Sequence, residues 1–150
     1  MQKFTCALLV DDDQTTNFLN QQLLKRLNLT DNIQVALNGQ EAFEKLDAHC
    51  KQATAELPAL LLLDIKMPVM DGFQFLEAFA ELPQAQQQNV VIVMLTTSLH
   101  PQDMSRVQQL NIAGFLNKPL TKEKLLDVLD TYSTRNTVAN QAASVGAQIM

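Results

Sequence analysis

The amino-acid sequence predicts an α/β fold with a mostly parallel sheet, because short apolar segments alternate with segments of helical periodicity five times. A second observation is that the apolar segments stop abruptly at polar side chains such as Asp11, Asp64 and Thr96. The carboxyl ends of parallel strands meet at one edge of the sheet, and ligands bind at that edge in open α/β folds. The fold class and the place of the functional site are therefore predicted together.

Five segments are predicted to be strands. Three of them are short, continuous apolar runs, which are typical of strands buried on both faces of a parallel sheet. In the second segment, Ile33, Val35 and Leu37 alternate with other residues, and this pattern indicates a more exposed strand. The five segments are residues 4–10, 33–37, 59–63, 90–95 and 114–117.

Helices are predicted after each strand, where apolar side chains recur every three or four residues. Residues that can cap a helix precede three of these segments: Asp13, then Asn38 with Glu41 three residues later, and finally Thr121. The apolar positions are Phe18, Leu19, Leu23 and Leu27; Phe43, Leu46, Cys50 and Ala53; Phe75, Leu76, Phe79 and Leu82; Met104, Val107 and Leu110; and Leu125, Leu129 and Tyr132.

The composition excludes several classes of protein. The chain has 150 residues, of which 47% are apolar and 18% are charged, as expected of one globular domain. Its formal net charge of -5 argues against direct binding to nucleic acid, because contact with the phosphate backbone needs a basic surface. The longest apolar run, residues 57–64, is too short to cross a membrane, and residues 1–5 do not begin a signal peptide. We therefore expect a cytoplasmic protein with no membrane partner.

The two cysteines, Cys6 and Cys50, form no CxxC motif and have no second cluster of metal ligands nearby in the sequence. A structural zinc site is therefore not expected. In a cytoplasmic protein, both side chains are expected to be reduced and buried as small apolar groups.

The chain is expected to consist of one domain, residues 1–133, followed by a C-terminal segment, residues 134–150. Beyond Arg135 this segment has no charged residue, and a flexible tail is expected. The alternative is a thin apolar stripe on a helix that needs a partner to be stable. The residues of that stripe are Val138, Ala142, Val145 and Ile149. Within the domain, the glutamine-rich segment 83–89 is expected to be a surface loop.

Three carboxylates at adjacent strand ends indicate a metal site. Asp11 and Asp12 follow the first strand, Asp64 ends the third, and the three charges repel one another unless a cation neutralises them. Mg²⁺ prefers oxygen ligands and is commonly held by one or two carboxylates and a phosphate oxygen. A carboxylate can also act as the nucleophile that forms an aspartyl phosphate. The Thr96 hydroxyl and the Lys118 ammonium, at two further strand ends, would then bind phosphoryl oxygens.

Four motifs in order along residues 4–133 resemble the receiver domain of two-component response regulators. They are Leu8–Asp12 (LLVDD), Leu62–Gly72 (LLDIKMPVMDG), Leu95-Thr96, and Phe115–Pro119 (FLNKP). The resemblance implies a flavodoxin-like, doubly wound (βα)5 fold with a five-stranded parallel sheet in the strand order 2-1-3-4-5.

The resemblance also assigns the site residues. It implies that Asp64 is the phosphoacceptor and a metal ligand, that Asp12 binds Mg²⁺ directly, and that Asp11 acts largely through water. The backbone carbonyl of Lys66 would complete the ligands from the protein. Thr96 and Lys118 would bind the phosphoryl group. Thr96 would also act as a switch together with Phe115, which stands where the family pattern has tyrosine and so lacks a phenol hydroxyl.

The implied function is that of a stand-alone, chemotaxis-type response regulator in a two-component system or phosphorelay. It would accept a phosphoryl group from a phosphohistidine of a histidine kinase or histidine phosphotransferase, and phosphorylation would change which protein target it binds. It would catalyse only its own phosphorylation and slow dephosphorylation. A homodimer through the last helices is a possible further partner.

Two alternatives compete with this interpretation. One is a phosphorylation-independent interaction module on a receiver fold. The other is a haloacid-dehalogenase-like phosphatase, because Asp11, Asp13 and Thr15 fit a DxDxT motif in which Asp11 is the nucleophile. Such a phosphatase needs a further acidic pair at a strand end after the lysine. The acids after Lys118 all lie in the pattern of the last helix: Glu123, Asp127 and Asp130.

Overall fold

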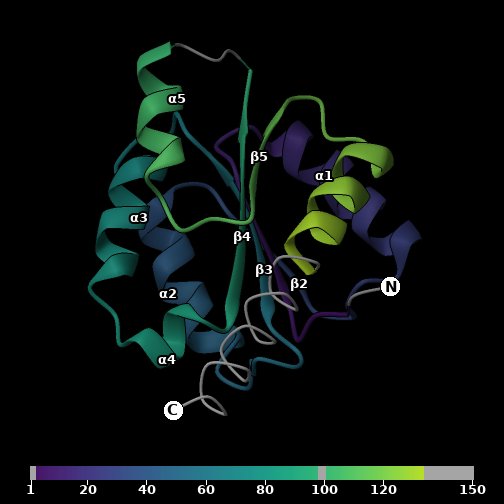
Figure 1. Cartoon of the computed structure of the whole chain (residues 1–150). Coiled ribbons are helices and arrows are strands. Elements are labelled where there is room, and N and C mark those ends of the chain that lie inside the picture. The colour runs from purple at the N-terminus through teal and green to yellow at the C-terminus, as the bar shows by residue number, and fades with distance from the viewer. Residues whose placement is uncertain (1–2, 98–100, 134–150) are drawn as a thin grey trace, which may run out of the picture.

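The computed structural model describes residues 3–97 and 101–133. Five parallel strands form one sheet in the order β2-β1-β3-β4-β5 (Figure 1). The strands are β1 (Ala7–Val10), β2 (Ile33–Ala36), β3 (Ala59–Asp64), β4 (Val90–Thr96) and β5 (Gly114–Asn117). The flavodoxin-like α/β fold and the strand order 2-1-3-4-5 are therefore confirmed.

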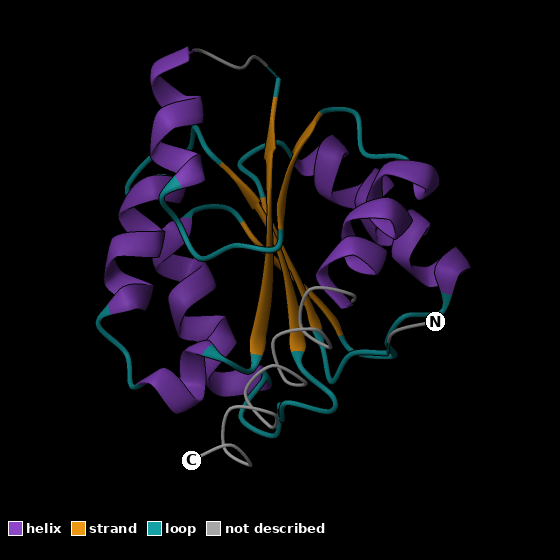
Figure 2. Ribbon diagram, in the orientation of Figure 1, coloured by secondary structure: helices purple, strands orange, loops and turns teal. Residues whose placement is uncertain are grey.

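Helices cover both faces of the sheet (Figure 2). One face carries α1 (Gln14–Leu27) and the last helix, which is described over residues 122–133. The other carries α2 (Gly39–His49), α3 (Gly72–Ala80) and α5 (Pro101–Gln108), with the short α4 (Gln84–Gln87) following α3. None of the described helices combines the length and the apolar character needed to span a bilayer. The C-terminal segment 134–150 lies outside the described residues, so what was expected of it stays a prediction.

The sheet separates two apolar cores. In β3, Leu61 and Leu63 pack in the core beneath α2 and α3, whereas Leu60 and Leu62 pack in the core beneath α1 and the last helix. Every residue of β1 and β3 is buried. Burial of one leucine side chain contributes about 1.5–3 kcal/mol to the stability of the fold. The strands are therefore stably packed and fix the positions of the residues that follow them.

The helix caps follow the sequence closely. The Asp13 carboxylate accepts a hydrogen bond from the Thr15 amide and caps α1. Asn38 caps α2 by accepting from the Glu41 amide, as the pair in the sequence predicts. Such caps satisfy amide groups that have no partner within the helix and typically contribute about 1 kcal/mol each.

The apolar face predicted for the first helix is partly wrong. Phe18 and Leu19 are 58% and 59% exposed. The buried face of α1 instead consists of Asn17, Asn20, Leu23, Leu24 and Leu27. Asn17 can be buried because its side-chain amide donates a hydrogen bond to the backbone carbonyl of Asp11. The spacing of the apolar residues could not reveal that two asparagines belong to the buried face.

Two smaller expectations also need correction. The segment 83–89, expected to be a loop, contains the four-residue helix α4. The Gln87 side-chain amide donates to the carbonyls of Ala80 and Leu82 and so joins this helix to the end of α3. In α5, Met104 is 42% exposed, while Val107 packs against the core as the periodicity predicts. Leu110 also packs there, but it lies two residues beyond the end of α5.

Cys6 and Cys50 are buried, as predicted, but the expectation that both are reduced is wrong for this structure. A disulfide joins them across 44 residues, with their Cα atoms 6.0 Å apart. It connects the chain just before β1 to the C-cap residue that follows α2. A pairing of this kind depends on tertiary proximity, which the spacing of two cysteines in a sequence does not reveal.

Candidate functional site

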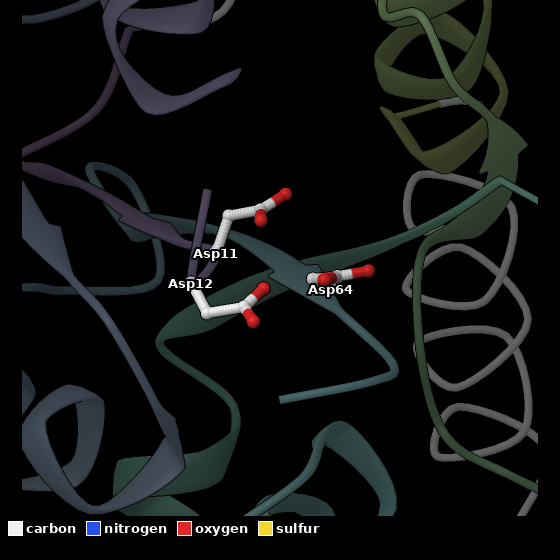
Figure 3. A group of neighbouring side chains, drawn as sticks. All are labelled: Asp11, Asp12 and Asp64. Atoms are coloured by element: carbon white, nitrogen blue, oxygen red, sulfur yellow. The ribbon is translucent and has the colours of Figure 1, made fainter. Parts of the chain in front are cut away.

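The register of the sheet brings three aspartates to one edge. Val10 of β1 pairs with Leu63 of β3, so the next residues, Asp11 and Asp64, follow neighbouring strands at the same level. Asp12 is adjacent to Asp11 along the chain. One carboxylate oxygen from each of the three residues lies within 4.8 Å of the others (Figure 3). The aspartates expected at this edge therefore do lie together.

The three carboxylates differ in burial. Asp11 and Asp64 are 3% and 7% exposed, whereas Asp12 is exposed. Buried carboxylates need compensating contacts, and both have them. Asp11 Oδ1 accepts from the Asp13 amide at 2.9 Å, and Asp64 Oδ1 accepts from the Ile65 amide at 2.9 Å.

Lys118 links the two buried aspartates. Its Nζ lies 2.5 Å from Asp11 Oδ2 and 3.3 Å from Asp64 Oδ1. Pairing of Thr96 with Asn117 at the ends of β4 and β5 places Lys118 at this edge, and the Lys118 amide donates to the Thr96 carbonyl at 2.7 Å. The peptide bond between Lys118 and Pro119 is cis. The predicted lysine is therefore part of the cluster.

The remaining predicted residues surround this cluster on the same edge. Thr96 ends β4 and is 3% exposed. Phe115 lies on β5, is partly buried, and packs against the core beneath α2 and α3. Lys66 is exposed, two residues after Asp64. The structure thus gives all three a position consistent with the site, and their individual roles stay predictions.

The electrostatics of the cluster favour an added cation. Burial raises the pKa of Asp64, the negative charge of Asp11 raises it further, and Lys118 opposes both effects. Burial lowers the pKa of Lys118, but its hydrogen bond to Asp11 and the charges of Asp64 and Asp11 outweigh that effect and raise it. Lys118 is therefore charged at neutral pH, and within the described part of the chain one ammonium group contacts this cluster of three carboxylates.

The donor set fits Mg²⁺. The cluster offers only oxygen ligands, with one exposed carboxylate and two buried ones, which matches a hard cation that keeps several waters. Among the described residues, none forms a hydrogen bond or ion pair with the Asp12 carboxylate, so it is available as a direct ligand. Both oxygens of Asp11 already have partners, Asp13 and Lys118. This difference agrees with a direct role for Asp12 and a water-mediated role for Asp11.

Asn17 contributes to the site, although its sequence position alone did not single it out. Its Nδ2 donates to the Asp11 carbonyl at 2.8 Å, with both residues buried, and so fixes the turn that carries Asp11 and Asp12. Its Oδ1 is buried without a hydrogen-bond partner among the described residues. The available signal was the spacing of Asn17, Asn20, Leu24 and Leu27, which places all four on one helical face.

Gly72 ends one of the sequence motifs, and the structure shows why a glycine is needed there. It begins α3, and its amide donates to the Ile65 carbonyl at 2.8 Å, which closes the loop after Asp64. A Cβ at this position would lie 2.5 Å from the Asp64 carbonyl oxygen and 3.0 Å from the Ile65 Cα. The backbone that carries Asp64 thus passes too close to α3 for any side chain at residue 72.

Comparison with known proteins decides the family. Residues 7–130 match the response regulator receiver domain. This chain is a member of the receiver domain family. It is 31% identical over 123 residues to the two-component response regulator 24 of Arabidopsis thaliana, covering 82% of this chain and 80% of that protein. The crystal structure of a two-component response regulator from Cytophaga hutchinsonii is similar at 26% identity and a TM-score of 0.75, covering 89% of this chain and 99% of that one.

Receiver domains also occur inside larger sensors. The osmosensing histidine protein kinase SLN1 of Saccharomyces cerevisiae is 32% identical over 130 residues, which cover 83% of this chain and 10% of the kinase. Receiver domains are in general signalling modules of two-component systems that interact with histidine kinases or phosphotransferases and bind Mg²⁺ in an acidic pocket.

Metal binding to this receiver domain should depend unequally on its two N-terminal aspartates. Loss of an outer partner of a metal site typically lowers affinity by about 10- to 100-fold. We expect Asp12→Ala to lower Mg²⁺ affinity by at least that factor, and Asp11→Ala to lower it less, because Asp11 already has protein partners. Calorimetric titration measures both affinities, and circular dichroism checks the fold. Equal losses in the two variants would contradict the proposed division of roles.

The stability of the receiver domain should depend on pH through Asp64. Folding raises the pKa of Asp64 above its ordinary value of 3.8. At a pH between the pKa of Asp64 in the unfolded chain and its higher pKa in the folded chain, the folded chain therefore binds more protons than the unfolded chain. Stability without Mg²⁺ should therefore fall as the pH rises through that window. Above it, Asp64→Asn should be more stable than the native chain, and this advantage should disappear at lower pH. Urea unfolding at a series of pH values measures the difference.

Asp13→Asn provides a control of opposite sign. Hydrogen bonds from the Thr16 hydroxyl and the Thr15 amide lower the pKa of Asp13, so its charged form stabilises the fold at higher pH. Asparagine still caps the helix, but the variant should lose stability relative to the native chain as the pH rises. If the stability of the Asp13 and Asp64 variants relative to the native chain changed with pH in the same direction, the raised pKa of Asp64 would be wrong.

Proposed function

We propose that this receiver domain accepts a phosphoryl group on Asp64 from a phosphohistidine of a sensor kinase or phosphotransferase. The observation that carries the proposal is the contact of Lys118 with both Asp11 and Asp64 beside the exposed Asp12 carboxylate. This arrangement provides an acceptor, a cation for the phosphoryl oxygens and oxygen ligands for Mg²⁺, which are the groups that phosphoryl transfer needs.

The two oxygens of Asp64 are not equivalent. Oδ1 accepts from the Ile65 amide and contacts Lys118, whereas Oδ2 has no hydrogen bond or ion pair among the described residues. We infer that Oδ2 attacks phosphorus while the bond from phosphorus to the histidine nitrogen breaks and its electron pair returns to the imidazole. Asp12, Asp64, the Lys66 carbonyl and, through water, Asp11 would hold Mg²⁺. The bound ion would neutralise charge on the phosphoryl oxygens.

Phosphorylation would change the contacts of Lys118. Its ammonium group, now shared by two carboxylates, would bind a phosphoryl oxygen, and the Thr96 hydroxyl would bind another. Because the Lys118 amide is bonded to the Thr96 carbonyl, these movements would act on the ends of β4 and β5 together. Phe115, two residues before the end of β5, would transmit the change to a surface that binds a target.

The edge also carries exposed apolar side chains suited to a protein donor. Phe18 and Leu19 lie near the start of α1, and Val69 lies in the loop after Asp64 and is 80% exposed. We infer that these exposed side chains would provide apolar contact area for a kinase or phosphotransferase domain. A stand-alone role, a cytoplasmic location and a homodimer through the last helices stay predictions.

The phosphatase alternative is disfavoured by the surroundings of Asp11. Its two oxygens are engaged by the Asp13 amide and Lys118, and the residue is 3% exposed, so neither oxygen is open to a substrate. The acids after Lys118 belong to the last helix, which packs on the same face of the sheet as α1. They therefore do not form the acidic pair at a strand end that the phosphatase needs. Of the two buried carboxylates, Asp64 is the one whose second oxygen has no hydrogen bond or ion pair among the described residues.

Beryllofluoride, a mimic of the phosphoryl group, separates the candidate functions. With Mg²⁺, we expect bound fluorine resonances in the native chain, retained in Asp13→Asn and absent in Asp64→Asn, together with shifted amide resonances at Thr96 and Phe115. Fluorine resonances that persist in Asp64→Asn would indicate another nucleophile such as Asp11. No bound resonance in the native chain would support the phosphorylation-independent module.

A further inference from the structure

The disulfide connects two elements at the sheet edge opposite the aspartates. Cys6 precedes β1, whereas Asp11 follows it, so the whole strand separates the bond from the acidic cluster. Cys50 is the C-cap of α2, and its amide donates to the Leu46 carbonyl. The bond therefore holds the C-terminal end of α2, at the lower edge in Figure 1, against the base of β1.

The two sulfur-bearing residues differ in access. Cys6 is 0% exposed, within the core beneath α2 and α3. Cys50 is 8% exposed and lines a cavity of about 470 Å³ between α2, α3 and the start of β4. The exposed residues Glu44, Asp47 and Lys51 also line this cavity, so it is reached from solvent. A cavity of this size accommodates a small organic thiol.

We propose that Cys50 is a thiol–disulfide exchange site, at which a small thiol of the glutathione class enters the cavity and forms a mixed disulfide. Thiol–disulfide exchange depends on which sulfur the attacking thiolate can reach. Because Cys6 is enclosed, attack occurs at the Cys50 sulfur, and the electron pair of the broken bond goes to Cys6, which leaves as a thiolate and takes a proton.

The exchange balances over two steps. A second small thiolate attacks the sulfur of the small thiol in the mixed disulfide. This step forms the small-molecule disulfide and releases Cys50 as a thiolate. Two small thiols are thus oxidised while the protein disulfide is reduced to two thiols. In the reverse direction, Cys50 reacts with the small-molecule disulfide, and Cys6 displaces the small thiol to restore the bond. Cys50 is the exchanging residue and Cys6 the resolving one.

The test uses full-length Cys6→Ala and Cys50→Ala, each retaining one thiol, with oxidised glutathione as the probe. Intact mass spectrometry under native conditions should show a mixed disulfide on Cys50 in Cys6→Ala. The Cys6 thiol of Cys50→Ala should react at least about tenfold more slowly, because its reaction must wait for local opening of the fold. In denaturant both variants should react alike. Mg²⁺ binding at the opposite edge and circular dichroism report whether each variant is folded.

A measurement on the native chain covers the case in which a variant fails to fold. The native chain is partly reduced with reduced glutathione, alkylated, and digested, and the cysteine that carries glutathione is located by mass spectrometry. We expect glutathione on Cys50. Glutathione on Cys6, equal reaction of the two variants, or reduction only at the rate of global unfolding would overturn the proposal.

Discussion

Asp64→Asn is expected to reduce phosphorylation by a small phosphodonor to the background level. An amide oxygen is a much weaker nucleophile than a carboxylate and a poorer ligand for Mg²⁺. Asparagine keeps the size of the side chain and relieves the repulsion between Asp64 and Asp11, so the loss would not arise from unfolding. The measurement is retention of labelled phosphate after incubation with Mg²⁺ and acetyl phosphate.

Asp13→Asn is the matched control for this loss. Asp13 lies two residues from Asp11, caps α1 and accepts from Thr15 and Thr16, but is not one of the three clustered aspartates. Asparagine also caps helices, so this variant should stay folded and be labelled like the native chain. Full labelling of the Asp64 variant, or equal losses in both, would reject Asp64 as the acceptor.

Gly72→Ala is expected to lower the free energy of unfolding by about 3 kcal/mol, the upper range for overpacked sites. On intrinsic helix propensity alone, alanine should stabilise a helical position by up to about 1 kcal/mol relative to glycine. The added Cβ reverses that sign because it would overlap the Asp64 carbonyl, a backbone atom that cannot turn away. Displacement of this carbonyl should also slow phosphorylation of Asp64.

Gly114→Ala serves as the comparison. A Cβ there would meet Val128, a side chain of the last helix, at 2.8 Å. A side chain can shift more easily than a backbone. Gly114→Ala should therefore lose less stability than Gly72→Ala, and its phosphorylation should be unaffected. Urea unfolding measures both changes. A Gly72→Ala chain at least as stable as the native one would show that α3 and the Asp64 loop are not in tight contact.

The local patterns were sufficient for the α/β class because they agree with one another, whereas the strand order came from the resemblance to receiver domains. All five strands were predicted, three of them from apolar runs, and the caps Asp13, Asn38 and Thr121 each accept a hydrogen bond from an amide in the first turn of their helix. The exposed Phe18 and Leu19 show the limit of periodicity, since it identifies a helix but not the face that packs inward. The buried face includes Asn17, whose hydrogen bond to the Asp11 carbonyl is not visible in the spacing of apolar residues.

The site was predictable to the extent that it depends on strand ends. Parallel strands in register place Asp11 and Asp64 side by side, and the sequence alone indicates where each strand stops. The contact of Lys118 with both carboxylates and the close approach of Gly72 to the Asp64 carbonyl depend on loop conformations. The Cys6–Cys50 bond likewise depends on how α2 packs against β1, and burial of the two cysteines was all that their residue type predicted.

Location of the phosphoryl group on the native chain tests the proposed function most directly. The chain is incubated with acetyl phosphate in the presence of Mg²⁺ or of a chelator, digested, and mapped by mass spectrometry before and after treatment with hydroxylamine. We expect one phosphoryl group on Asp64, dependent on Mg²⁺ and removed by hydroxylamine. A phosphoryl group on Asp11, or none at all while the chain is folded and binds Mg²⁺, would contradict the assignment of Asp64 as the phosphoacceptor.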